Sequence, residues 1–487
     1  MIKIITYDIK EGMKTLFLNP PSFEDFDGGA GSRYQATREV TSFWYPTWLC
    51  YPAGLIKGSR LVDAPAEHLG IDEVLAIAKD FELIVIYTST PSINNDISVA
   101  EKIKDFNKDT KIIFVGPHPS ALPEETLKAS NAIDIVAKRE FDYSIMEIAQ
   151  GKKLDEIDGI SYKSNGDIVH NQNRKYIEDL DSLPYVVDIY KRDLNINNYI
   201  IPYLLKPYVS IYTGRGCSSK CVYCLWPQTF SGNYYRVRSV GNVIEEVKRT
   251  LELYPEVKEI FFDDDTFTAN KKRARELSRG LKELNITWST TSRANTDYET
   301  LKMMKDSGLR LLVVGYESGN QEILDNIRKG ITLDEAREFT KICKKLGIMI
   351  HGAFILGLPE ETPESINDSI KFACELDIDT IQVSLASPYP GTQLYDLCIE
   401  KNYLVKTDMV NERGWQTCSV QYPGISSVEI FKSVERFYKK FYYRPRFILR
   451  ILKKIIFNGE ERRKILREGS EFKKFIANRK KVLKGIS

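Results

Sequence analysis

The chain has 487 residues, 43% of them hydrophobic and 28% charged, with a net charge of +2. This length predicts two or three domains, and the composition excludes disordered and fibrous proteins. The first ten residues lack the apolar core of a signal peptide, and no apolar run reaches the roughly 18 residues that span a bilayer. We therefore expect a cytoplasmic protein.

Buried strands alternate with helices in the first third of the chain. Continuous valine, isoleucine and leucine runs favour a doubly wound parallel sheet, in which ligands bind beyond the carboxyl ends of the strands. No GxGxxG follows the first strand, so a dinucleotide is not expected. Asn165-Gly166 predicts a hairpin turn, and a linker is expected at 177–188. A Rossmann-like domain over residues 1–185 is expected, with strands within 14–21, 59–65, 82–89, 111–118 and 132–138.

A second and longer alternation predicts a partial (β/α)6 barrel over residues 200–405. Polar residues stand at the carboxyl ends of its strands, among them Asp263-Asp264-Asp265, Arg293 and Glu317-Ser318. Since these ends meet at one mouth of a β/α barrel, where active sites are built, we expect these side chains to share a cavity. The strands are expected within 208–216, 259–265, 286–292, 309–318, 348–357 and 380–388.

Three of the eight cysteines lie within eight positions, in CSSKCVYC, directly after the first strand of this barrel. A structural zinc site needs four ligands, and no second pair of ligands stands nearby. A disulfide framework is not expected in a reduced compartment. Cys217, Cys221 and Cys224 instead suit a [4Fe–4S] cluster, in which the iron without a cysteine keeps an open position for a small molecule.

The C-x3-C-x2-C spacing resembles the cluster motif of the radical S-adenosylmethionine (SAM) superfamily. The resemblance implies that the open iron binds SAM, which is then cleaved to a 5′-deoxyadenosyl radical that takes a hydrogen atom from the substrate. AFILGLPE at 353–360 resembles the family's GxIxGxxE adenine motif, with Ala353 in place of the first glycine. The implied SAM contacts are Tyr223, Asp265, Arg293, Glu317, Ser318, Ile355, Gly357 and Glu360.

A Rossmann-like domain ahead of such a barrel is similar to the cobalamin-binding subgroup of the superfamily, which implies cobalamin as a further cofactor. VGPHPS at 115–120 stands where that subgroup often has a Gly-Pro-His turn. No DxHxxG motif is present, so a histidine ligand to cobalt from below is not expected. A scaffold sheet without cobalamin is the alternative. The expected cobalamin contacts are Ser89, Thr90, Gly116 and His118.

Four segments resemble radical SAM proteins of hopanoid biosynthesis that act in making the cyclitol ether head group: 26–49, 224–232, 261–268 and 387–395. This resemblance implies an isomerase- or transferase-type reaction, the ring contraction of a lipid-linked amino sugar. A cobalamin-dependent radical SAM methyltransferase is one alternative, and a non-catalytic iron–sulfur protein is another. The enzymes would need a small-molecule or lipid-linked substrate and an electron donor of the flavodoxin or ferredoxin type.

The last expected domain, residues 406–487, is a basic helical region. Residues 439–487 hold 17 Lys and Arg and four Glu, a balance of +13 that leaves −11 on the rest of the chain. A basic amphipathic helix is typical of contact with the inner face of a membrane, and packing on the barrel is the alternative. Nucleic acid is not expected, because few aromatic residues stand among the basic ones. One helical stripe is expected to hold Arg446, Arg450, Lys453 and Lys454.

Overall fold

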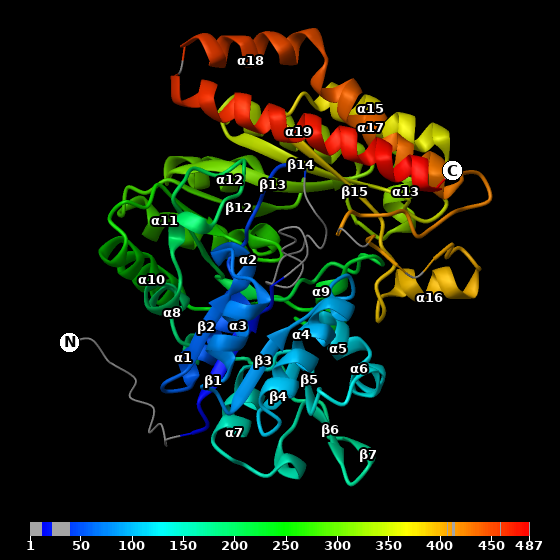
Figure 1. The fold of residues 1–487 in the computed structure, drawn as a ribbon. Coiled ribbons are helices and arrows are strands. Elements are labelled where there is room, and N and C mark those ends of the chain that lie inside the picture. Colours follow the sequence, from blue (N-terminus) through cyan, green and yellow to red (C-terminus); the bar gives the residue numbers. More distant parts are fainter. Residues whose placement is uncertain (1–11, 22–38, 407, 412–413, 458, 487) are drawn as a thin grey trace.

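The computed structural model describes residues 12–21, 39–406, 408–411, 414–457 and 459–486. Figure 1 shows a sheet from the first third of the chain, a second sheet from the middle, and C-terminal helices lying over the second sheet. The predicted fold class is confirmed, because a Rossmann-like domain precedes a six-stranded parallel sheet. No helix in the described ranges is long and apolar enough to cross a bilayer.

The first sheet has the strand order β2-β1-β3-β4-β5-β6-β7. Its five parallel strands are the five predicted, and their order is that of flavodoxin-like sheets, which bind ligands where the order reverses, between β1 and β3. The predicted hairpin is confirmed, with positive φ at Asn165 and Gly166, and it continues the sheet antiparallel to β5. The strands are β1 (Thr15–Asn19), β2 (Arg60–Asp63), β3 (Leu83–Tyr87), β4 (Lys111–Val115), β5 (Ile135–Ala137), β6 (Ile160–Ser164) and β7 (Asp167–His170).

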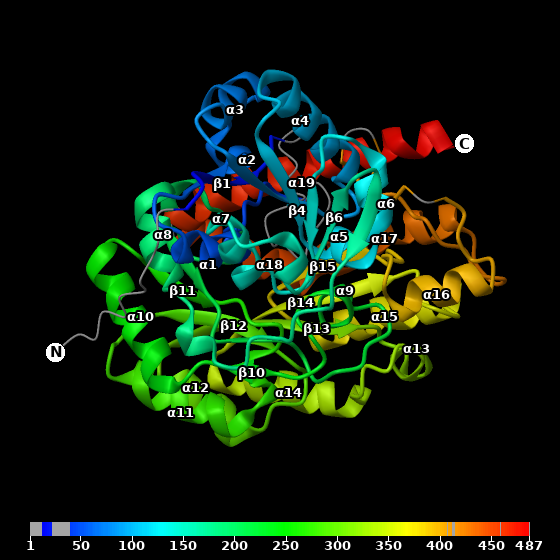
Figure 2. The same ribbon diagram turned by 90° about the horizontal axis from the view of Figure 1, so that it is seen from below.

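Helices cover both faces of this sheet (Figure 2). They are α1 (Thr47–Leu55), α2 (Ala64–Glu67), α3 (Ile71–Ala78), α4 (Ile93–Phe106), α5 (Pro117–Ala121), α6 (Pro123–Ala129) and α7 (Asp142–Ala149). Short 3₁₀ helices in the chain lie at Leu154–Glu156, Leu180–Ser182, Ile196–Asn198 and Phe267–Ala269. The linker predicted at 177–188 is wrong in its last three residues, because α8 (Val186–Asp193) begins there. Its apolar residues Val186, Val187 and Tyr190 are buried, and it packs against α1 and α10.

The second sheet follows the chain order from β8 at one edge to β15 at the other, with every strand parallel. Its six strands are the six predicted. They are β8 (Tyr208–Ile211), β11 (Glu259–Phe262), β12 (Trp288–Ser292), β13 (Leu309–Glu317), β14 (Met349–Leu356) and β15 (Thr380–Leu385), and a small ladder joins β9 (Gly214–Arg215) to β10 (Arg236–Val237). The helices are α9 (Leu225–Thr229), α10 (Val240–Leu253), α11 (Lys271–Lys282), α12 (Tyr298–Asp306), α13 (Gln321–Asn326), α14 (Leu333–Leu346), α15 (Pro363–Leu376) and α16 (Gln393–Glu400).

The C-terminal helices are α17 (Ser427–Tyr442), α18 (Pro445–Phe457) and α19 (Gly459–Ile486). Helix α17 covers β15, the edge strand that an incomplete barrel leaves open. There the backbone N–H groups of Ile381 and Val383 donate to the hydroxyls of Tyr442 and Tyr438, at 3.1 and 2.8 Å. An unpaired strand edge invites aggregation, so the two tyrosines take the place of a missing strand.

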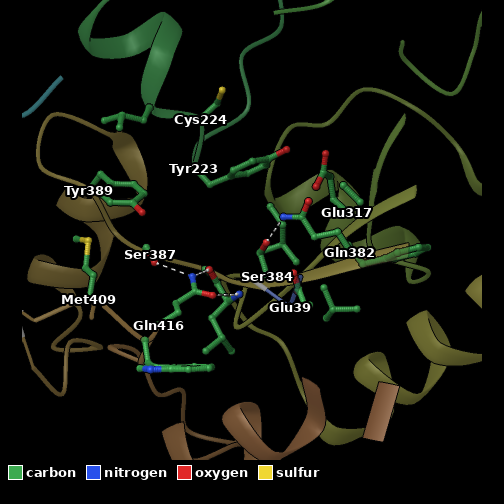
Figure 3. A pocket seen from close by; sticks show the side chains of 18 of the residues that line it. Glu39, Tyr223, Cys224, Glu317, Gln382, Ser384, Ser387, Tyr389, Met409 and Gln416 are labelled. Carbon is green, nitrogen blue, oxygen red and sulfur yellow. Dashed lines mark hydrogen bonds between the residues drawn. The ribbon is translucent and has the colours of Figure 1, made fainter. Parts of the chain in front are cut away.

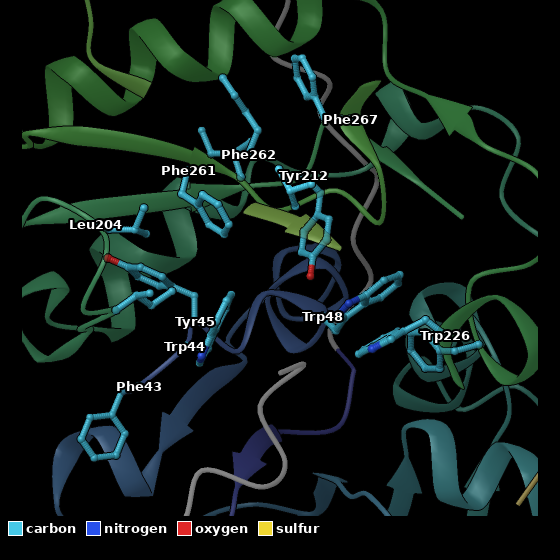
Figure 4. Packing of buried hydrophobic residues seen from close by; sticks show 14 of the residues in the cluster. Phe43, Trp44, Tyr45, Trp48, Leu204, Tyr212, Trp226, Phe261, Phe262 and Phe267 are labelled. Atoms are coloured by element: carbon cyan, nitrogen blue, oxygen red, sulfur yellow. The ribbon is translucent and has the colours of Figure 1, made fainter. Parts of the chain in front are cut away.

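A large aromatic cluster joins the two sheets (Figure 4). Trp44 packs against Phe261 of β11, with 6.1 Å between the ring centroids, and Trp48 of α1 stacks on Trp226 of α9 at 5.5 Å. Both tryptophans belong to the segment at 26–49, so its second half has a structural role between the sheets. Residues 26–38 of that segment lie outside the described residues.

An ion pair crosses the same junction. The guanidinium of Arg215 on β9 donates to both carboxylate oxygens of Asp142, at 2.9 and 3.0 Å. Arg215 as a whole is only 3% exposed. The guanidinium lies 4.4 Å from the ring of Trp48 and 4.5 Å from the ring of Tyr51. Because Arg215 stands two residues before Cys217, the interface between the sheets also fixes the start of the cysteine segment.

Candidate active site

The three cysteines lie on one loop between β9 and α9, at the carboxyl end of the second sheet. Cys217 and Cys221 are buried, Cys224 is half-buried, and none forms a disulfide. Burial raises the pKa of the Cys221 thiol, while the ammonium group of Lys329 opposes that shift. The loop therefore presents three free thiols from a short stretch of chain.

The thiols fit a cluster better than a single metal ion. Within the described part of the chain, no three His, Cys, Asp or Glu side chains gather at one point where they could hold an ion. A [4Fe–4S] cluster spaces its ligands more widely than a single ion does, because each thiolate binds a different iron of the cube. The donor set therefore fits the cluster, with Cys217, Cys221 and Cys224 as the proposed ligands.

Asp265 and Arg293, both expected to contact SAM, brace the cysteine loop. The Asp265 carboxylate accepts from the backbone N–H of Gly216 at 3.1 Å and from the Ser231 hydroxyl at 3.0 Å. Arg293 donates to the hydroxyl of Ser219, within the loop, and to backbone carbonyls on the segment that follows α13. Neither side chain lines the cavity described next.

Gly216 shows how tightly this loop is held. Its φ is +87°, and a Cβ atom there would lie 2.2 Å from the carbonyl oxygen of Tyr234. A side chain at this position would therefore displace the backbone directly before Cys217.

A cavity of about 250 Å³ opens beside the cysteine loop (Figure 3). Tyr223 and Cys224 line it from the loop, Glu317 from the end of β13, and Ile355 from β14. The structure thus brings together three of the expected SAM contacts and one proposed cluster ligand. The Oε1 atom of Gln382, in the same wall, is buried without a hydrogen-bond partner. The cavity is therefore suited to a polar ligand that can donate a hydrogen bond, as the adenine amino group of SAM can.

Glu317 is held by a lysine that the sequence did not single out. Lys329 donates to its Oε1 atom at 2.6 Å, and both side chains are at least nine-tenths buried. Burial disfavours the charged form of Lys329, but Glu317 and Cys221 together outweigh burial and raise the lysine pKa. Figure 3 shows the ring of Tyr223 directed towards Glu317, whose carboxylate adds to the effect of burial in raising the tyrosine pKa. Glu317 also has a φ of +66°, a strained conformation of the kind found at functional sites.

Three expected SAM contacts lie away from the cavity. The hydroxyl of Ser318 is fully buried and pairs with Ser369 of α15 at 3.0 Å, on the outer side of β13. Gly357 lies past the end of β14. Glu360 is exposed and accepts from the hydroxyl of Tyr403 at 3.0 Å. These placements correct the prediction that all the strand-end polar residues share one cavity.

Glu361, the neighbour of Glu360, has a structural role at the same turn. The carboxylate of Glu361 accepts from the backbone N–H of Gly357 at 2.5 Å and is 1% exposed. Burial raises its pKa to about 8, although the backbone donors of Gly357 and Leu358 oppose the shift. Glu361 therefore fixes the turn after β14 that carries Ile355 into the cavity.

The expected cobalamin contacts lie together at the carboxyl ends of β3 and β4. The imidazole Nδ1 of His118 lies 3.1 Å from the hydroxyl of Thr90, and burial lowers the histidine pKa to about 4, so the ring is neutral. Gly116 has a φ of +115°, and a Cβ there would lie 2.3 Å from the carbonyl oxygen of Thr88. Helix α5, which carries His118, packs against α9 behind the cysteine loop. The expected cobalamin contacts thus lie at one edge of the first sheet, and the α5–α9 contact connects that edge to the helix that follows the cysteine loop.

Comparison with known proteins identifies the class. The sequence pattern of the radical SAM superfamily matches residues 211–373, and that of the B12 binding domain matches residues 36–149. A relative from Pyrococcus horikoshii, named an uncharacterized methyltransferase, is 34% identical over 425 residues, which are 83% of this chain and 89% of the relative. The chain belongs to the radical SAM superfamily, in the group that carries a B12-binding domain.

Other similar proteins include the cytidylyl-2-hydroxyethylphosphonate methyltransferase of Streptomyces wedmorensis, 30% identical over 50% of this chain and 48% of that protein. The structure of the radical SAM methyltransferase TsrM from Kitasatospora setae shares the fold, with a TM-score of 0.68 and 15% identity over 89% of each chain. Another structure of TsrM holds cobalamin and a [4Fe–4S] cluster. The two family matches give the cofactors of this chain as a [4Fe–4S] cluster, SAM and cobalamin. The names of these relatives favour methyl transfer over the ring contraction expected from the sequence.

Proposed function

We propose that this protein is a cobalamin-dependent radical SAM methyltransferase. The observation that carries the proposal is the likeness, over most of both chains, to a protein named a methyltransferase, in a chain that has both cofactor domains. The packing of α5 against α9 supports it, because the two expected cofactor sites then lie on the same side of the molecule.

In this proposal the chain's residues have three separate tasks. Cys217, Cys221 and Cys224 hold the cluster on a loop that Asp265 and Arg293 keep in place. Tyr223, Glu317 and Ile355 form the wall against which SAM is oriented. Ser89, Thr90, Gly116 and His118 form the edge that receives cobalamin. When bound, these cofactors supply a methyl group and a radical, while a flavodoxin- or ferredoxin-type donor supplies the electron.

The proposal predicts that a methyl group leaves SAM and enters the substrate. Protein reconstituted anaerobically with iron, sulfide and cobalamin is incubated with trideuteromethyl-SAM, a reductant and a metabolite and lipid extract of the source cells. A product heavier than its substrate by one deuterated methyl group is expected by mass spectrometry. Ring contraction of a hopanoid-linked sugar would leave product and substrate with equal mass. Formation of 5′-deoxyadenosine without any labelled product would therefore contradict methyl transfer.

We propose in addition that α18 touches the surface of an anionic membrane. Its buried side carries Phe447, whereas four other large apolar residues are between 40% and 71% exposed. These four recur on one helical face, and they are Ile448, Leu449, Leu452 and Ile456. Exposed Arg446 and Lys453 flank that face. An exposed apolar stripe beside cations matches the interfacial boundary of an anionic bilayer.

The variant Leu449→Ser/Leu452→Ser/Ile456→Ser tests this contact. Moving one leucine or isoleucine side chain fully from water into an apolar phase contributes about 1.5–3 kcal/mol of binding free energy. The triple variant should therefore bind vesicles of phosphatidylglycerol and phosphatidylcholine at least about a hundredfold more weakly. Phe106→Ser/Ile399→Ser removes exposed apolar residues far from α18 and should change nothing. Sedimentation with vesicles measures both. Equal binding by the triple variant and the wild type, or no vesicle binding by either, would refute the contact.

A further inference from the structure

The C-terminal helix α19 contributes an arginine to the cavity beside the cysteine loop. Figure 1 shows α19 passing back over β14 and β15. Two residues of this helix, Phe475 and Arg479, line the cavity. Arg479 is 4% exposed, so the protein holds a guanidinium group almost completely out of water. Arginine is rarely buried to this extent unless a negative group accompanies it.

The contacts of Arg479 leave part of its guanidinium unused. One terminal nitrogen donates to the carbonyl oxygen of Phe431 at 2.8 Å, and the group lies 3.8 Å from the centre of the Phe431 ring. Its Nε atom is buried without a hydrogen-bond partner. Among the described residues, no carboxylate lies within ion-pair distance of it. The arginine therefore keeps a donor and an uncompensated charge.

Nearby acidic groups offset only part of the cost of burying this charge. Burial is the largest influence on Arg479 and lowers its pKa to about 10, against the opposing effects of Tyr438, Glu39 and Glu435. Glu39 lines the same cavity, but its carboxylate accepts a hydrogen bond from the hydroxyl of Tyr438. A buried cation that its own surroundings disfavour is stabilised when an anion enters beside it.

An aromatic surface adjoins the arginine. Trp415 and Phe475 both line the cavity, and their rings stack with 5.8 Å between centroids and 29° between planes. Tyr223 and Glu317, the proposed SAM contacts, line the same cavity. The cavity wall thus includes both proposed SAM contacts and a cation accompanied by stacked aromatic rings.

We infer that Arg479 and the Trp415–Phe475 pair form the binding site for an anionic group, a carboxylate or a phosphate, on an aromatic or apolar methyl acceptor. The identification of the bearer as a methyl acceptor rests on the proposed function, whereas the preference for an anion does not. The carboxylate of SAM is the other source of such a group. Its binding is therefore measured separately.

The test uses matched aromatic probes with the intact, anaerobically reconstituted protein. Phenylacetate and phenyl phosphate carry the anion, while phenylacetamide and benzyl alcohol are neutral counterparts, and binding is followed by ligand-observed NMR. We expect the anions to bind with dissociation constants about ten- to a hundredfold lower than those of the neutral probes, because only the anions form a charge-assisted hydrogen bond with Arg479. Comparison of phenylacetate with phenyl phosphate shows which anion the site prefers.

Arg479→Gln should abolish this preference and leave binding of the neutral probes unchanged, and Arg479→Lys should restore part of it. Arg450→Gln is the matched control, because Arg450 also donates to a backbone carbonyl, that of Ile378 at 3.0 Å, but stands on α18 outside the cavity. Circular dichroism checks that each variant is folded.

Two results would overturn the inference: no anion preference in the wild type, or an Arg479→Gln variant whose preference is unaltered. Weaker binding of SAM in Arg479→Gln, with unchanged probe binding, would assign the arginine to SAM and also refute it. Anion preference without any methyl transfer would instead refute the proposed function and leave the anion site standing.

Discussion

Alanine in place of Cys217, Cys221 or Cys224 is expected to abolish both cluster binding and reductive cleavage of SAM. In the proposed assignment each thiolate binds a different iron, so each single loss would leave a second iron without a protein ligand. The iron content and the visible absorption of anaerobically reconstituted protein measure the cluster. Chromatography of 5′-deoxyadenosine after reduction with dithionite measures the cleavage.

Cys374→Ala is the control for these variants. Cys374 is a half-buried cysteine on α15, whose thiol contacts the backbone of α17 rather than the cavity. Its variant should keep wild-type iron content. A triple cysteine variant that still holds its cluster and cleaves SAM would disprove the assignment of the three ligands.

The strands themselves and the position of the cysteine loop along the chain were predictable from the sequence, because both depend on local patterns. Runs such as Leu83–Tyr87 are apolar at every position, as strands buried on both faces must be, and β3 is buried throughout. The spacing of the three cysteines needs no knowledge of distant contacts. In α/β folds the sheet order then places the loop at the carboxyl edge.

The orientation of single side chains was not predictable in the same way. A register shift between Gly315 and Glu317 turns Glu317 towards the cavity, and the next residue, Ser318, then faces α15. A left-handed φ at Glu360 sends its side chain outward, so that Glu361 reaches the backbone of Gly357. In both places one residue's backbone conformation decides which polar group enters the site, and composition or spacing carries no sign of it.

The C-terminal region shows a second limit. Helical spacing correctly predicted a helix with cations on one stripe. It gave no sign that Arg450 of that stripe donates a hydrogen bond to the backbone carbonyl of Ile378. The position of Arg479 in the cavity depends on how α19 folds back over β15, a contact between segments about a hundred residues apart. The sequence offered no local signal for this contact.

Replacing Arg215 with methionine is expected to lower the free energy of unfolding by about 3–5 kcal/mol, because it leaves the Asp142 carboxylate buried without its cation. Methionine keeps much of the apolar contact with Trp48 and Tyr51, so the lost charge dominates the effect. Arg249→Met removes a surface ion pair with Asp188, also at 3.0 Å, and should cost no more than about 1 kcal/mol. Urea unfolding followed by circular dichroism compares the two variants.

The Arg215 variant should also lose cobalamin and iron together, since the arginine ties the domain of β1–β7 to the loop that carries Cys217. Asp142→Asn/Arg215→Met removes both charges and should recover part of the stability, because a neutral amide then replaces the buried carboxylate. A cost for Arg215→Met as small as that for Arg249→Met would mean that the aromatic cluster alone holds the two domains together. If stability falls but both cofactors stay bound, the ion pair supports the fold without positioning the cysteine loop.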